Sequence, residues 1–159
     1  MKIKNLLLGF FLLLSATSFA QDTNSSQTNK LNVGIFAPLF LDSAFNGNIY
    51  IYDKSFPRFT LQGFDFVQGV KIAMDSFPLK DNPIETYIYD TKSDSLNIST
   101  LISNHELDKL NLIIGAVRDE DLTLLADFAK SKKIPFVSAT YPNDGGVKSN
   151  PYYIVLNST

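Results

Sequence analysis

"LIIGAVRDEDLTLLADFAKSKKIPFVSAT", residues 112–140, places a strand, a helix and a second strand in close succession. The apolar run at 112–117 is typical of a strand covered on both faces. Acids open the segment at 120–133 and lysines close it, as the helix dipole favours. Its apolar residues recur at helical spacing: Leu122, Leu125, Ala126 and Ala129. Residues 134–140 are again apolar. Because consecutive parallel strands need a crossover of this kind, the stretch predicts a parallel sheet.

The same alternation extends in both directions from this stretch. The other predicted elements are strand, helix, strand, helix and a final strand: 31–40, 59–77, 84–90, 95–110 and 151–159. One face of the strand at 84–90 is more polar than the other, so we expect this strand at or near an edge of the sheet. Gly69 lies inside the first helix, where we expect it to permit close packing on the sheet. The predicted fold class is therefore α/β, a three-layer α/β/α open parallel sheet.

The N-terminal twenty residues, "MKIKNLLLGFFLLLSATSFA", have the three parts of a secretory signal peptide. Lysines open the segment, an apolar stretch covers 6–14, and Ser18 and Ala20 supply the small residues of a cleavage site after Ala20. An uncleaved anchor is the alternative, but the apolar stretch is short for a membrane span. We expect a periplasmic or secreted protein. Its predicted organisation is a signal peptide (1–20), a flexible polar lead (21–30) and one domain (31–159).

The amino-acid composition argues against several classes of function. The 159 residues contain no cysteine and one histidine, His105, in a predicted helix. Metal sites built from His or Cys and a Ser-His-Asp set are therefore not expected. No glycine pattern for a dinucleotide or phosphate is found. The net charge of −2 gives no electrostatic case for nucleic acid. We expect a binding protein, not an enzyme, with no catalytic residue and no cofactor.

Candidate ligand-binding residues follow the predicted strands, because ligands of open parallel sheets gather at the carboxyl ends of the strands. The two arginines of the chain, Arg58 and Arg118, are both predicted at this edge. A guanidinium suits a carboxylate in two-point contact, and Arg118 beside Asp119 can hold both ends of a zwitterion. The alternative is that Asp119 and Asp121 cap the following helix and Arg118 is their solvated partner.

Two further segments contribute to the predicted site. Ser138, Thr140 and Tyr141 follow the fourth strand and can add neutral hydrogen bonds. The segment 39–58 is long for a loop and rich in aromatic residues, among them Tyr52, which can stack on a sugar or an apolar group. An ordinary hairpin over 49–53, packed on the sheet edge, explains that segment equally well.

The order of these pieces resembles the N-terminal lobe of type I periplasmic binding proteins, which include the branched-chain amino-acid receptors of ABC transporters. The resemblance covers residues 31–159. It is carried by "LNVGIFAPLF", "GFDFVQGVKIAMDSF", "YIYDTKSD", the stretch 112–140 and "NPYYIVLNST". It implies a flavodoxin-like lobe that binds its ligand against a second lobe. The implied binding segments are 45–58, Arg118–Asp119 and Ser138–Tyr141.

This chain differs from the amino-acid receptors in two places. It has "RDED" where they tend to carry small hydroxyl residues, and its first loop is longer. The expected ligand is therefore a small polar molecule: an amino acid, a peptide or a cell-wall fragment. The chain is about half as long as a two-lobed receptor, so we expect a truncated receptor that lacks its second lobe, with a membrane permease as possible partner. The alternatives are an envelope interaction module connected with the cell wall and a small exported flavodoxin-like enzyme.

Overall fold

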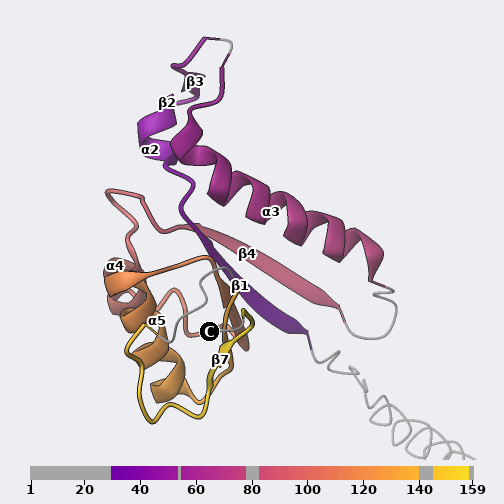
Figure 1. Cartoon of the computed structure of the whole chain (residues 1–159), viewed down its shortest axis with the longest axis vertical. Coiled ribbons are helices and arrows are strands. Elements are labelled where there is room, and N and C mark those ends of the chain that lie inside the picture. Colours follow the sequence, from indigo (N-terminus) through magenta and orange to yellow (C-terminus); the bar gives the residue numbers. More distant parts are fainter. Residues whose placement is uncertain (1–29, 54, 78–82, 140–144, 158–159) are drawn as a thin grey trace, which may run out of the picture.

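The computed structural model describes residues 30–53, 55–77, 83–139 and 145–157. They form a parallel five-stranded sheet in the order β4-β1-β5-β6-β7 (Figure 1). In chain order its strands are β1 (Leu31–Ala37), β4 (Ile84–Asp90), β5 (Leu112–Gly115), β6 (Phe136–Ser138) and β7 (Tyr153–Val155). Counted along the chain, this is the 2-1-3-4-5 order of flavodoxin-like sheets. The predicted α/β class and parallel sheet are confirmed, and β4 lies at an edge as expected.

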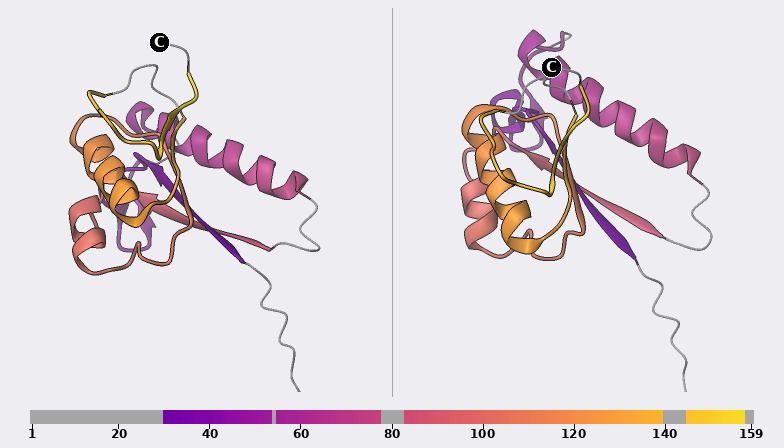
Figure 2. Two further views of the ribbon diagram at one scale, coloured as in Figure 1. Left: turned by 90° about the horizontal axis from the view of Figure 1, so that it is seen from below. Right: turned by 60° about the horizontal axis from the view of Figure 1, so that its bottom comes forward.

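Helices cover both faces of the sheet. The helix α3 (Arg58–Ser76) lies on one face, whereas α4 (Ile98–Ser103) and α5 (Asp119–Lys132) lie on the other (Figure 2). Each helix joins two strands of the sheet, which is the right-handed crossover arrangement expected of parallel neighbours. The loops that leave β1, β4 and β5 therefore meet at one edge.

The main core lies between the sheet and the pair α4 and α5. Phe36, Ile113 and Phe136 come from three adjacent strands and are fully buried. The predicted stripe of α5 faces them, and all four of its members are buried: Leu122, Leu125, Ala126 and Ala129. Burying such side chains stabilises the fold by about 1.5–3 kcal/mol for each large one. Because α5 is held along its whole length, its first turn is fixed at the edge of the sheet.

The helix α4 is shorter than the sequence predicts, ending at Ser103 and not near residue 110. His105 adopts a left-handed conformation with φ of 61°. Its backbone N–H bonds to Ile102, and that of Glu106 bonds to Leu101. This is the Schellman arrangement that closes a helix. His105 therefore lies just past the helix, with an exposed side chain, as expected for a surface residue.

The opposite face is covered mainly where α3 lies on β1. The backbone of α3 comes close to that of Pro38 at Gly63. A Cβ there would overlap the carbonyl oxygen of Pro38 and lie 2.6 Å from its carbonyl carbon. Gly69, which the sequence suggested for this role, is exposed, and a methyl group at this position would meet nothing within 4 Å. Away from α3 the same face opens: Ile35 is buried on β1, whereas Ile154 on β7 is exposed.

A small arm extends beyond the carboxyl end of β1 (Figure 1). It consists of α2 (Leu41–Ala44), β2 (Phe45–Asn46) and β3 (Ile49–Tyr50), and the two strands pair antiparallel. Gly47, with φ of 59°, supplies the left-handed conformation that the tight turn needs. The hairpin alternative is therefore right in kind. The predicted bounds were wrong, since the paired strands cover 45–46 and 49–50 and not 49–53. The predicted packing was also wrong, because β2 and β3 form a sheet of their own and do not extend the main one.

The predictions for residues 1–20 and 21–29 lie outside the described residues. Within the part that the structure describes, no helix is long and apolar enough to cross a membrane.

Candidate ligand-binding site

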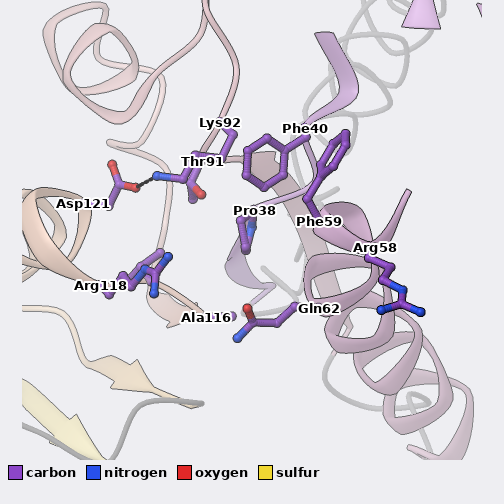
Figure 3. Close-up of a pocket in the computed structure, with 11 residues that line it drawn as sticks. Pro38, Phe40, Arg58, Phe59, Gln62, Thr91, Lys92, Ala116, Arg118 and Asp121 are labelled. Atoms are coloured by element: carbon purple, nitrogen blue, oxygen red, sulfur yellow. Dashed lines mark hydrogen bonds and ion pairs between the residues drawn. The ribbon is translucent and has the colours of Figure 1, made fainter. Parts of the chain in front are cut away.

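A pocket of about 270 Å³ lies where the loops after β1, β4 and β5 meet the start of α3 (Figure 3). The order of strands reverses here, with β4 on one side of β1 and β5 on the other, and such switch points are where open sheets bind ligands. The pocket is lined by Pro38, Phe40, Arg58, Phe59, Gln62, Thr91, Lys92, Ala116, Val117, Arg118 and Asp121.

One wall of the pocket is cationic. Arg118 directly precedes α5, and Lys92 follows β4 by two residues. The Nζ of Lys92 lies 2.7 Å from Oδ2 of Asp121 in the first turn of α5. Together with Arg58, the described residues of the lining include three cationic side chains and one acidic side chain. The pocket therefore favours an anion.

The opposite wall is aromatic. The ring centroids of Phe40 and Phe59 lie 5.2 Å apart with an interplanar angle of 75°. Figure 3 shows both rings across the pocket from Arg118, with Gln62 below them. The guanidinium of Arg58 points away from the other lining side chains in the same view. Arg118 and Lys92 are therefore the cations best placed to meet a bound anion.

Asp90 connects the loop after β1, which carries Phe40, to the loop after β4, which carries Lys92. Its Oδ1 accepts hydrogen bonds from the backbone N–H groups of Leu39, Phe40 and Lys92 at 2.9, 3.1 and 2.9 Å. Its Oδ2 accepts one from Leu41 at 2.7 Å. Hydrogen bonds to a charged acceptor are stronger than neutral ones. Asp90 therefore sets the position of Phe40 relative to Lys92, although the two residues belong to different loops.

The structure brings some of the predicted site residues together. Arg58 and Arg118 line the same pocket. Asp119 does not line it: its side chain is 86% exposed, that of Arg118 is 70% exposed, and Nε of Arg118 lies 3.6 Å from Oδ2 of Asp119. Tyr52 is not among the lining residues, and its ring centroid lies 6.1 Å from that of Phe59, which does line the pocket.

The residues predicted after the fourth strand are placed differently. Ser138 is fully buried at the end of β6, outside the pocket lining, and its Oγ has no hydrogen-bond partner among the residues that the structure describes. Thr140 and Tyr141 lie outside the described residues.

The alternative in which the acids cap the helix is confirmed for Arg118, which is an exposed ion-pair partner of Asp119, but neither Asp119 nor Asp121 is the N-cap residue. Arg118 is the N-cap residue of α5, and among the described residues its side chain makes no capping hydrogen bond. Asp119, Glu120 and Asp121 instead occupy the first turn, where negative charge suits the helix dipole. Asp121 turns toward Lys92 and so becomes part of the pocket.

Several lining residues were not among the predicted site residues. Gln62 lies one helical turn after Arg58, so the spacing of four could have indicated it. Lys92 closely follows the second predicted strand. The rule that ligands bind at the carboxyl ends of parallel strands, which indicated Arg118, therefore also indicates Lys92. Phe40 gave no comparable signal, because its orientation depends on Asp90.

A second, acidic pocket of about 400 Å³ lies beside the edge strand β4. Asp42, Asp90 and Glu106 line it together with two serines and apolar or aromatic side chains, and none of its lining residues in the described part of the chain is basic. It would repel a carboxylate. Within the described ranges, no group of His, Cys, Asp and Glu side chains could hold a metal ion. The cationic pocket is therefore the better candidate for binding an organic anion.

Comparison with known proteins adds no assignment: no protein-family model matches the chain, and no curated protein matches it either.

Proposed function

We propose that the chain is an exported, non-catalytic solute-binding lobe that holds a small carboxylate-bearing ligand at the carboxyl edge of its sheet. The observation that carries the proposal is the convergence of Arg118 and Lys92 on one pocket at the strand-order switch. The 2-1-3-4-5 sheet and this location agree with the resemblance to the first lobe of a type I periplasmic binding protein. An amino acid, a peptide or a cell-wall fragment would each supply a carboxylate.

The chemistry of the lining suits binding. A ligand carboxylate can accept hydrogen bonds from the guanidinium of Arg118 in a two-point contact. Lys92 can share its charge between Asp121 and the ligand, and Gln62 offers an amide that donates and accepts. The volume lies just below the range of about 300–1,000 Å³ usual for ligand pockets. A second lobe closing over this edge would complete the cleft and strengthen binding, and a permease would be the partner for transport.

The test is calorimetric titration of the mature chain with amino acids, short peptides and a muramyl peptide. Arg118→Ala should weaken binding of a carboxylate ligand about tenfold or more, since hydrogen bonds to charged groups contribute about 1.5–3 kcal/mol. The melting temperature should stay nearly unchanged, because the side chain is largely exposed. Unaltered affinity in Arg118→Ala would exclude this pocket as the carboxylate site.

An envelope interaction module is the second candidate, and the tip of the arm favours it. Ile49 is 71% exposed there, and Ile51 is exposed beside it. Exposed apolar side chains on a projecting hairpin are typical of contact with a larger partner. If the chain serves this role, the double variant Ile49→Ser, Ile51→Ser should lose retention on isolated cell envelopes, whereas Arg118→Ala should not.

A further inference from the structure

Aromatic side chains form a continuous series of contacts from the pocket lining into the arm. Phe40 meets Phe59, and Phe59 meets Tyr52, with ring centroids 5.2 and 6.1 Å apart. Beyond Tyr52 the series continues at centroid distances of 5.2–6.0 Å through Tyr50, Phe45, Phe56 and Phe64. The aromatic wall is thus one end of a larger surface.

This surface is only partly used by the fold. Phe59 is 44% exposed and Tyr52 is 36% exposed, even though each contacts other rings. Contiguous apolar surface of this kind marks binding sites more often than scattered exposed residues do. Because Phe40 and Phe59 also line the cationic pocket, the exposed ring surface and the cations border the same space.

The geometry of the two rings suits a third aromatic group. Phe40 and Phe59 are nearly perpendicular, at 75°. A ring that enters beside them can meet the face of one and the edge of the other, and both are preferred aromatic contacts. The opposite wall meanwhile offers Arg118 and Lys92 to a negative charge. An occupant that satisfies both walls has a carboxylate at one end and an aromatic or large apolar group at the other.

We propose that the pocket selects organic acids with an aromatic or bulky apolar group, and that Phe40 and Phe59 determine this specificity. The inference rests on the proposed function, since it assigns the chemistry of the ligand held at the same site. It goes further because it rejects small hydrophilic acids as preferred ligands. It also gives the long first loop a role: the loop supplies the apolar half of the site.

The experiment compares two acids of equal charge, propionate and 3-phenylpropionate, by titration of the mature chain monitored by NMR. We expect 3-phenylpropionate to bind at least tenfold more tightly, because burying a phenyl group is that favourable. Phe59→Ala should reduce the ratio to near one, and Phe59→Leu, which keeps apolar bulk, should retain part of it. Phe64→Ala is the matched control, since Phe64 belongs to the ring series but does not line the pocket. Circular dichroism establishes that each variant is folded.

Each other outcome has a definite meaning. Equal affinity for the two acids, with both lost in Arg118→Ala, would overturn the specificity inference and leave the proposed function standing. Binding of neither acid would overturn both. A preference for the phenyl acid that survives Phe59→Ala and Phe40→Ala would place the apolar subsite elsewhere. Self-association that depends on Phe59, seen by analytical ultracentrifugation, would assign the rings to contact between copies and would also overturn the inference.

Discussion

The Nζ of Lys92 lies 2.7 Å from Oδ2 of Asp121, so an ion pair joins the loop after β4 to the first turn of α5. Both residues line the candidate pocket. Partly exposed pairs contribute only about 0–1 kcal/mol to stability. The main effect of Asp121 is therefore electrostatic: it offsets one of the positive charges that a ligand carboxylate would meet.

Asp121→Asn should raise the affinity for a carboxylate about two- to tenfold, because Lys92 would no longer share its charge with an acid. The free energy of unfolding should change by less than about 1 kcal/mol. Calorimetric titration measures the first quantity, and urea unfolding measures the second. Asp75→Asn is the matched control: it changes net charge equally, but Asp75 pairs with Lys71 on α3, outside the pocket. An equal gain in both variants would show only a general charge effect.

The parts of the fold that could be predicted from sequence are those set by local periodicity. Leu122 and Leu125 recur at helical spacing, and both are buried in α5. The end of α4 could not be predicted in this way. It depends on a left-handed conformation at His105, a residue type that carries no strong signal for it.

The candidate site was predictable only in part, for a related reason. Arg118 follows a strand directly, so the topology alone brings it to the edge of the sheet. Phe40 and Lys92 meet there because Asp90 accepts hydrogen bonds from the backbone of Lys92, two residues away, and from that of Phe40, fifty residues away in sequence. Such a long-range contact produces no periodic pattern in the amino-acid sequence. Gly63 and Gly69 show the same limit, since both lie in one helix and only the packing on β1 distinguishes them.

Gly63→Ala and Gly69→Ala should have opposite effects on stability. A methyl group at Gly63 would overlap the backbone of Pro38, so α3 must move away from β1, and we expect a loss of about 2 kcal/mol or more. At Gly69 a methyl group meets nothing within 4 Å, and alanine favours the helix by about 0.5–1 kcal/mol. Urea unfolding of both variants measures the difference. Destabilisation by Gly69→Ala would mean that α3 packs differently.

Asp90→Asn should destabilise the loops that form the pocket. The substitution removes the charge and replaces one acceptor oxygen by an NH2 group, which would face backbone N–H donors now bonded to the carboxylate. We expect a loss of about 2–3 kcal/mol in the free energy of unfolding. Asp94→Asn, a change at an exposed position in the same loop, serves as control and should have little effect.

The same variant should also lose ligand affinity, since Phe40 and Lys92 would no longer be held together. If Asp90→Asn unfolds at the same urea concentration as the wild type, the four hydrogen bonds do not secure these loops.

Asp108 should give stability a dependence on acid pH. The hydrogen bond from Lys132 lowers the pKa of the Asp108 carboxyl, and the contact with His105 lowers this pKa further. The folded-state pKa thus lies below the unfolded value of about 3.9. The ion pair consequently stabilises the fold above about pH 4, and this contribution is lost as the pH falls through the lowered folded-state pKa.

Lys132→Met tests this relationship, because Nζ of Lys132 lies 2.8 Å from Oδ1 of Asp108. In a carbon-detected NMR titration, the pKa of Asp108 should rise toward its ordinary value. Urea unfolding should separate the variant from the wild type at pH 7 more than at pH 2. Lys132 also lies over the ring of Phe128, but that contact does not depend on the charge of Asp108 and so affects both pH values alike. Lys130→Met on the same helix is the control, and an unchanged Asp108 pKa in Lys132→Met would assign the shift to another neighbour.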